Sequence, residues 1–146
     1  MSSATAPRHL TGSCLCGAVR YEVADAFEYA ANCHCSKCRR TTGAACKPFA
    51  GIPVGQLQLT AGDDSLLVYG DPADSHDLHC RQCGSLLYSV VRDGAWAHVA
   101  MGTLIDAPLI RPTEHIFVGS KAPWHEITDG LPQYEGHAVG EPMQGR

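Results

Sequence analysis

Apolar and polar residues alternate with a period of two in several short stretches of the chain. Residues 19–23 read VRYEV and residues 56–60 read QLQLT, so one side of each stretch is apolar and the other polar. This alternation predicts half-buried β-strands. Four further runs are rich in β-branched and aromatic residues, which also favours strands. These runs are residues 66–69, 86–91, 96–100 and 115–118.

Turn-forming residues separate the predicted strands and indicate a mostly β fold. Residues 92–95 read RDGA, and the Asp-Gly pair supplies the positive φ that a type I′ hairpin turn requires. A single helical turn is predicted at residues 36–42, where Gly43 can end it in the left-handed conformation. Gly, Pro and Asp also gather at residues 51–53, 62–64 and 70–72.

The chain has 146 residues, of which 45% are hydrophobic and 18% charged, as is typical of one compact domain. We expect this domain at residues 11–135, after an extension at residues 1–10 and before a flexible, polar tail at residues 136–146. The formal net charge of −4 disfavours nonspecific binding to nucleic acid or to an acidic membrane surface. No apolar stretch is long enough to span a membrane as a helix.

Residues 1–10 lack the apolar core of a secretory signal, which predicts a cytoplasmic protein. Cytosolic thiols stay reduced, so clustered cysteines indicate metal or redox chemistry before disulfides. Eight cysteines lie in the first 83 residues, seven of them in three groups, and Cys46 stands alone. The groups are Cys14 and Cys16, then Cys33, Cys35 and Cys38, then Cys80 and Cys83.

The pair Cys80 and Cys83 is followed by glycine, which is the pattern of a zinc knuckle that supplies two of four ligands. The natural complement is Cys14 and Cys16, a pair that is also followed by glycine. Together these four thiolates predict a closed, structural zinc site that joins the N-terminal strand to the middle of the chain.

The remaining group, Cys33, Cys35 and Cys38, offers three thiolates within six residues. Three protein ligands with a vacant fourth position are typical of a catalytic zinc rather than a structural one. The sequence therefore predicts two zinc ions per chain, the second in a site that can lose its ion. Three alternatives stay open: a disulfide framework, iron–sulfur ligation, or a single structural zinc with the three-cysteine group idle or closed by Cys46.

Charged and imidazole side chains surround the three-cysteine group. Lys37, Arg39 and Arg40 either form a solvated face or attract an anionic thiol substrate. His34 lies between two of the cysteines, and on extended backbone its ring would point away from them. It is either a structural histidine or a substrate contact, and it is the best local candidate for proton transfer. His98, on an apolar strand, is expected to be a satisfied strand residue or to line a pocket.

The three cysteine groups, read in order with their neighbours, resemble the glutathione-dependent formaldehyde-activating enzyme family, which also includes centromere protein V. The resembling segments are Gly12–Val19, Cys33–Arg40, Cys80–Ser85, and the closing residues 115–118 with 121–124. The resemblance implies a β-tent fold of antiparallel sheets held together by zinc. It also implies a structural zinc on Cys14, Cys16, Cys80 and Cys83, and a catalytic zinc on Cys33, Cys35 and Cys38.

The activity implied by this resemblance is formation of S-(hydroxymethyl)glutathione from formaldehyde and glutathione, a carbon–sulfur lyase reaction. The expected partners are therefore a small thiol such as glutathione and an aldehyde. A second hypothesis is a non-catalytic, zinc-bearing binding module that holds a partner on its β surface. A third is a redox or metal sensor built on exposed thiolates.

Overall fold

Strands dominate the computed structural model of the chain, which describes residues 6–140 and 142–143. Ten strands, one α-helix and four short 3₁₀ turns lie within these residues. The strands and the helix are β1 (His9–Ser13), β2 (Arg20–Ala24), β3 (Tyr29–Cys33), α1 (Ser36–Thr42), β4 (Lys47–Pro53), β5 (Leu57–Ala61), β6 (Leu66–Gly70), β7 (His76–Cys80), β8 (Leu86–Val91), β9 (Trp96–Ala100) and β10 (His115–Ile116).

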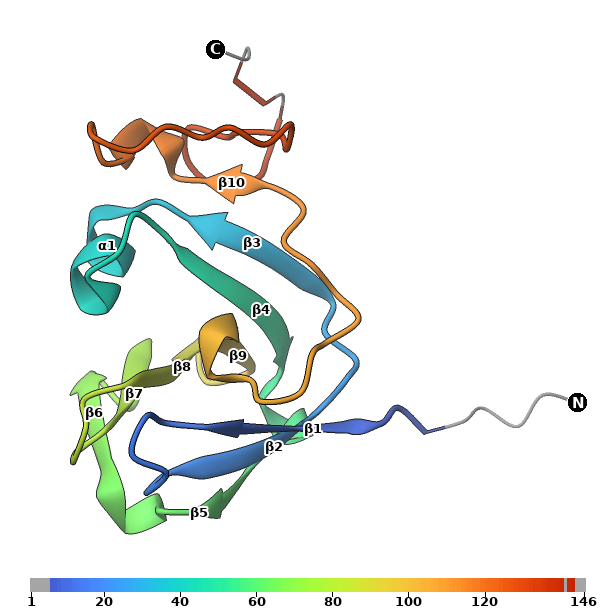
Figure 1. Cartoon of the computed structure of the whole chain (residues 1–146), viewed down its shortest axis with the longest axis vertical. Coiled ribbons are helices and arrows are strands. Elements are labelled where there is room, and N and C mark those ends of the chain that lie inside the picture. The colour runs from blue at the N-terminus through green and yellow to red at the C-terminus, as the bar shows by residue number, and fades with distance from the viewer. Residues whose placement is uncertain (1–5, 141, 144–146) are drawn as a thin grey trace, which may run out of the picture.

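The strands form two sheets that face each other (Figure 1). The smaller sheet has the order β1-β2-β5, and the larger one has the order β10-β3-β4-β9-β8-β7-β6. All neighbouring strands are antiparallel except β10 and β3, which run parallel. The mostly β fold expected from the sequence is confirmed, with this one parallel pair as a difference from purely antiparallel sheets.

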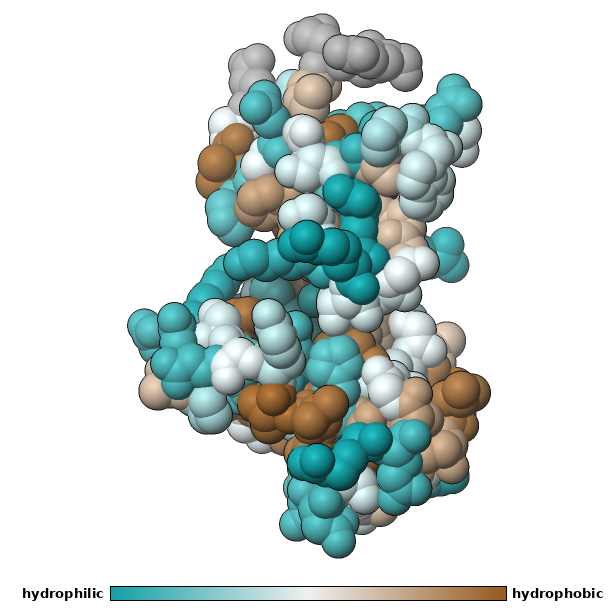
Figure 2. All heavy atoms as spheres, turned by 90° about the vertical axis from the view of Figure 1, so that its left-hand side faces the viewer, coloured by the Kyte–Doolittle hydropathy of each residue, from teal (hydrophilic) through white to brown (hydrophobic). Residues whose placement is uncertain are grey.

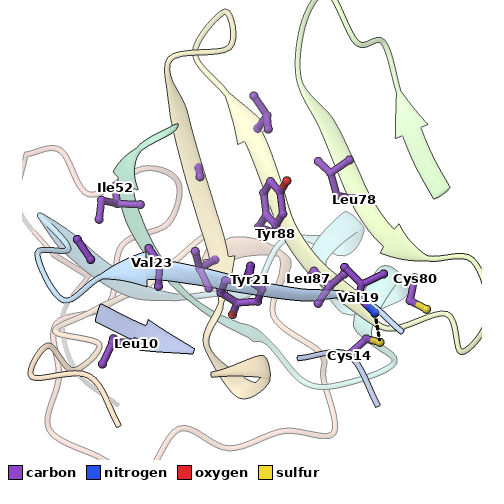
Figure 3. Close-up of a cluster of buried hydrophobic side chains, with 14 residues drawn as sticks. Leu10, Cys14, Val19, Tyr21, Val23, Ile52, Leu78, Cys80, Leu87 and Tyr88 are labelled. Carbon is purple, nitrogen blue, oxygen red and sulfur yellow. Dashed lines mark hydrogen bonds between the residues drawn. The ribbon is translucent and has the colours of Figure 1, made fainter. Parts of the chain in front are cut away.

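The main hydrophobic core fills the space between the two sheets (Figure 3). Leu10 and Val23 from the small sheet, and Ile52 and Leu87 from the large one, are fully buried. Gly12 lies in β1 against the ring of the buried Tyr21, where an added Cβ would come within 2.0 Å of a ring carbon. The small sheet therefore depends on this close approach of backbone to ring.

A second, smaller cluster lies where β10, β3 and β4 meet. Its buried members are Ala31, Cys33, Phe49 and Ile116. The register explains the grouping, because Ala31 pairs with Phe49 and Cys33 pairs with Ile116 across neighbouring strands. This cluster brings the end of β3, and with it the first cysteine of the three-cysteine group, to the end of the large sheet where the C-terminal segment packs (Figure 1).

Most elements predicted from the local pattern are confirmed, including the strands β2, β5, β6, β8 and β9. The helix spans Ser36–Thr42 as expected, and Gly43 caps it at φ 64°. The hairpin after β8 is present, although positive φ begins one residue early, at Arg92 (φ 54°). The strand expected at residues 115–118 ends at Ile116, because Phe117 turns into the left-handed region (φ 56°). Within the described residues, no helix combines the length and hydropathy needed to cross a membrane.

Candidate metal centres and the adjoining pocket

Two turns from different sheets bring four cysteines together. Cys14 and Cys16 lie in the turn after β1, whereas Cys80 ends β7 and Cys83 follows it in the turn to β8. Their four sulfur atoms all lie within 4.8 Å of one another. The Cys14 and Cys16 sulfurs are 3.7 Å apart, and those of Cys16 and Cys80 are 3.8 Å apart.

These distances fit a single tetrahedral ion. Four sulfurs at about 2.3 Å from a zinc ion lie about 3.8 Å from one another, the edge of the tetrahedron. Disulfide-bonded sulfurs would be about 2.05 Å apart, and all of these cysteines are free. The donor set and its spacing therefore suit zinc, and they fit neither disulfide pairing nor four unrelated thiols.

Local backbone structure holds both pairs in this arrangement. Gly17 (φ 83°) and Gly84 (φ 81°) take left-handed conformations that fold the chain back beneath the sulfurs. The amide of Val19 donates to the sulfur of Cys14 over 3.2 Å. Hydrogen bonds from Ser85, first from its hydroxyl and then from its amide, lower the pKa of Cys83 to about 5. This favours the thiolate, which is the form that binds a metal.

The second cysteine group is built from one short segment. Cys33 ends β3, Cys35 is the N-cap of α1, and Cys38 lies in the first turn of that helix. Their sulfurs also lie within 4.8 Å of one another. The Cys38 amide donates to the Cys35 sulfur over 3.3 Å. Hydrogen bonds from the thiols of Cys33 and Cys38 lower the pKa of Cys35, which favours its thiolate, and the same contacts raise the pKa of the two donating thiols. Three sulfurs suit a zinc ion that keeps one position for another ligand.

A cavity of about 600 Å³ adjoins this second group. Cys33 and Cys38 form part of its wall, and it extends along β3 as far as Tyr29. Four residues of extended strand separate Cys33 from Tyr29, which corresponds to about 13 Å. The other lining residues are Ala31, Lys47, Phe49, Val91, Arg92, His98, Glu114, Ile116, Phe117, His137, Ala138 and Val139.

Aromatic rings form the floor of the cavity. His98 stacks on Phe49 with ring centroids 4.4 Å apart, and the Tyr29 hydroxyl lies 2.6 Å from His98 Nε2. Burial, followed by the charges of Lys47 and Arg92, lowers the pKa of His98 to about 4. The ring is therefore neutral at pH 7, and its tautomer sets whether Nε2 accepts this hydrogen bond or donates it to the tyrosine oxygen.

Two cations flank this aromatic floor. Lys47 is only 8% exposed, and its ammonium group lies 5.8 Å from the Phe49 ring centroid. The Arg92 guanidinium lies over the rings of Tyr29 and Trp96, at 5.4 Å and 5.2 Å. Neither cation forms an ion pair with an acidic side chain among the described residues. Lys47 pairs with Cys33 in the register of β3 and β4, so one cation lies near the sulfurs and the other at the far end.

The C-terminal segment forms a further wall beside the sulfurs. The Phe117 amide donates to the Gly136 carbonyl over 2.8 Å, and the Val118 amide donates to the Tyr134 carbonyl over 2.9 Å. The ring of His137 packs edge-on against that of Phe117, with centroids 4.8 Å apart. A left-handed φ in a bulky residue such as Phe117 costs about 1 to 2 kcal/mol. The pairing with the C-terminal segment offsets this cost.

His34 lies behind the sulfurs rather than in the cavity. It is fully buried, and its Nε2 lies 2.8 Å from Nδ1 of His115. His115 Nε2 donates to the carboxylate of Asp129, 3.0 Å from each oxygen. Burial, and then the neighbouring His115, lowers the pKa of His34 to about 4. His34 is not among the residues that line the cavity, its buried Nδ1 has no hydrogen-bond partner within the described part of the chain, and its role in substrate binding stays a prediction.

The helical cations expected to contact substrate lie outside the walls of this cavity. Lys37 and Arg40 are exposed, and Arg39 donates to the carbonyl of Ser120 over 3.2 Å. Figure 2 shows a hydrophilic band at the height of α1 on the face that carries this helix. These three residues therefore do not form walls of this cavity, and their contact with substrate stays a prediction.

Cys46 belongs to neither sulfur group. It is half-buried and lines a separate cavity of about 410 Å³ between the α1 region and the turn after β7. Burial, followed by the charge of Asp129, raises the pKa of this thiol, which disfavours the metal-binding thiolate. Its sulfur is also not grouped with those of Cys33, Cys35 and Cys38, so Cys46 does not complete the three-cysteine group in this structure.

Most residues that line the cavity have no signal in the local sequence pattern. Lys47 and Phe49 belong to β4, a strand that the periodicity did not reveal, and Arg92 was noted only as part of a turn. The cavity depends on the pairing of β3 with β4 and β10, which no local pattern encodes. The one available indication was His98, an imidazole on an otherwise apolar strand.

Comparisons with known proteins agree with the sulfur pattern. The model of the glutathione-dependent formaldehyde-activating enzyme family matches residues 9–120. A Halomonas elongata protein with the provisional name glutathione-dependent formaldehyde-activating enzyme is 33% identical over 138 residues, covering 81% of this chain and 80% of its own. A Podospora anserina protein with the same provisional name is 32% identical over 80 residues, covering 53% of this chain and 38% of its own. The crystal structure of a Rhodobacter sphaeroides protein superposes with a TM-score of 0.56 at 26% identity, covering 68% of this chain and 91% of the other.

Proposed function

The chain belongs to the glutathione-dependent formaldehyde-activating enzyme family, and from this premise we propose that it is a zinc-dependent carbon–sulfur lyase. It makes or breaks the bond between the sulfur of a glutathione-like thiol and an aldehyde carbon. The observation that carries this proposal is the group of three sulfurs within 4.8 Å of one another, two of which line a cavity of about 600 Å³.

The two cysteine groups would hold metal ions with different roles. Cys14, Cys16, Cys80 and Cys83 would hold a structural ion, since all four positions of a tetrahedron are filled by protein sulfur. Cys33, Cys35 and Cys38 would hold the catalytic ion. A zinc ion with three sulfur ligands supplies Lewis acidity to a thiol or carbonyl group in the adjoining cavity.

The reaction conserves oxidation state. A thiol S–H adds across the aldehyde C=O, so a C–S bond forms, the π-electron pair of the carbonyl moves to oxygen, and the thiol proton ends on that oxygen. Cleavage is the reverse. No external oxidant or reductant is required, and the chain must only bind the two partners, orient them and keep bulk water away from the adduct.

The cavity residues suit these tasks. Glutathione carries two carboxylates and one ammonium group, and the cavity offers Lys47 near the sulfurs, Arg92 over the Tyr29 ring at the other end, and the carboxylate of Glu114. Lys47 and Arg92 would orient carboxylates through charge-assisted hydrogen bonds. The aromatic floor of Phe49, His98 and Tyr29 gives the thiol backbone an apolar surface to lie on.

A comparison of two cysteine variants tests the proposal. The rate of exchange between free glutathione and its formaldehyde adduct is measured by NMR, with the spontaneous rate subtracted, alongside zinc content. We expect the wild-type chain to accelerate exchange and to hold two zinc ions. Cys38→Ser should abolish the acceleration and hold one ion, whereas Cys46→Ser should behave like wild type. Unchanged acceleration in Cys38→Ser would overturn the assignment, and no acceleration by the wild-type, zinc-loaded protein would favour the binding module.

A further inference from the structure

The cavity beside the three sulfurs is apolar at the place where the reacting carbon would lie. Ile116 pairs with Cys33 across β10 and β3, and Phe117 follows it. The backbone pairing of Phe117 with Gly136 brings Ala138 and Val139 to the same end of the cavity. These apolar side chains therefore form one wall of the cavity at the sulfur end, beside the ammonium group of Lys47, while Arg92 lies at the opposite end.

This wall does not match the demands of formaldehyde. A formaldehyde unit has two non-hydrogen atoms and fills on the order of 60 Å³, about twice the share of one water molecule. The cavity measures about 600 Å³, a size that a glutathione-like thiol already explains, so the chemistry of the wall and not the volume bears on the aldehyde. The hydroxymethyl group is also polar, so it would leave the apolar wall in contact with water.

The wall has two features of a specificity element. Phe117 is held at φ 56°, a conformation that bulky residues rarely adopt and that tends to persist where a ligand is clamped. Ala138 and Val139 lie beyond residue 120, where the match to the family ends. These two wall residues thus lie outside the matched segment, whereas the seven grouped cysteines and Phe117 lie within it.

We propose that the cavity takes hemithioacetals whose carbon carries an aromatic or similarly sized apolar substituent, which packs against Phe117, Ala138 and Val139. The thiol part extends along β3, with its carboxylate toward Arg92. The inference rests on the proposed function, since it names the aldehyde class for the same site. The C–S bond that forms or breaks and the transfer of the proton to oxygen are unchanged.

Stable thioethers test the proposal without turnover. S-Methylglutathione and S-benzylglutathione differ only in the group that would contact the wall, and their affinities for the zinc-loaded full chain are measured by calorimetry. We expect the benzyl compound to bind at least about tenfold more tightly, which corresponds to about 1.4 kcal/mol. Equal affinities would overturn the proposal.

Two variants locate the preference at the wall. Val139→Asn removes apolar surface at the rim, where this side chain is 75% exposed, and Ala138→Phe fills the space. Each should reduce the ratio of benzyl to methyl affinity about threefold or more. Ile105→Asn is the matched control, because Ile105 is 67% exposed and lies outside the cavity. A benzyl preference that survives both wall variants would overturn the assignment of these residues.

The readouts separate this inference from the proposed function. If formaldehyde exchange is catalysed but the two thioethers bind equally, the lyase assignment stands and the apolar substrate class is wrong. If the benzyl compound is preferred but no C–S exchange is catalysed with formaldehyde or benzaldehyde, the proposed lyase is wrong, while the wall still determines what binds.

Discussion

Protonation of His98 should weaken the fold as the pH falls. Its ring is stacked on Phe49, its Nε2 lies 2.6 Å from the Tyr29 hydroxyl, and the charges of Lys47 and Arg92 lie close by. Protonation of the ring would add a third positive charge to the cavity. Burial and these two cations therefore hold the pKa of His98 at about 4.

The size of the effect follows from the difference between the two states. An unfolded histidine titrates near pH 6.5, whereas His98 in the fold titrates at about 4. Its stabilising contribution is thus fully present above about pH 6.5 and is lost as the pH falls toward 4. At pH 5 the unfolded chain is almost fully protonated at this position and the native chain only about one tenth, so the fold loses about 2 kcal/mol relative to pH 7.5.

Urea unfolding at pH 7.5 and pH 5, followed by circular dichroism, measures this loss. Acid also protonates the cysteine groups, so the informative quantity is the difference between wild type and His98→Gln, in which every other titrating group is retained. The variant should lose about 2 kcal/mol less between the two pH values. His9→Gln, at an exposed position of β1, is the matched control and should lose as much as wild type. Parallel losses in wild type and His98→Gln would refute the reasoning.

Three further substitutions probe the fold. Cys80→Ser should lower the melting temperature by about 10 °C, since it removes one of the four sulfurs that join the two sheets. The control Cys46→Ser should change the melting temperature little. Equal shifts in the two variants would contradict the structural metal site. Asp129→Asn should lower the free energy of unfolding by about 1 kcal/mol in urea, because the half-exposed acceptor of the hydrogen bond from buried His115 loses its negative charge. Gly12→Ala should cost about 2 kcal/mol or more by forcing a buried ring to move, and Gly102→Ala, where an added Cβ meets nothing within 4 Å, should not.

The sequence predicted those strands and the helix that are encoded by a pattern of a few neighbouring residues. Alternation in residues 19–23 and the Gly43 cap were sufficient for β2 and α1, because a strand face and a helix end are encoded within a few residues. The sulfur groups were also found from spacing, since two cysteines three residues apart must lie close together. The strand ending at Ile116 was predicted two residues too long, because the turn at Phe117 is imposed by pairing with the distant C-terminal segment.

The cavity and the histidine chain could not be predicted in the same way. Lys47 lies opposite Cys33 only because β3 and β4 pair in one register, and register depends on the whole sheet. His34 meets His115 because β10 runs parallel to β3, across 81 residues of sequence. Contacts of this kind are set by topology, and a single sequence carries no local pattern for them.

The two sulfur groups differ in the length of the loop that a metal ion bound to each would close. Cys14 and Cys80 are separated by 66 positions along the sequence, whereas Cys33, Cys35 and Cys38 lie within one six-residue segment. Metal bound to the first group would close a long loop and so reduce the conformational entropy of the unfolded chain. The affinity of this site for metal and the stability of the fold must therefore change together. Metal bound to the second group closes almost no loop. Its affinity can therefore be tuned by selection, or the ion exchanged during the working life of the protein, at little cost to the fold.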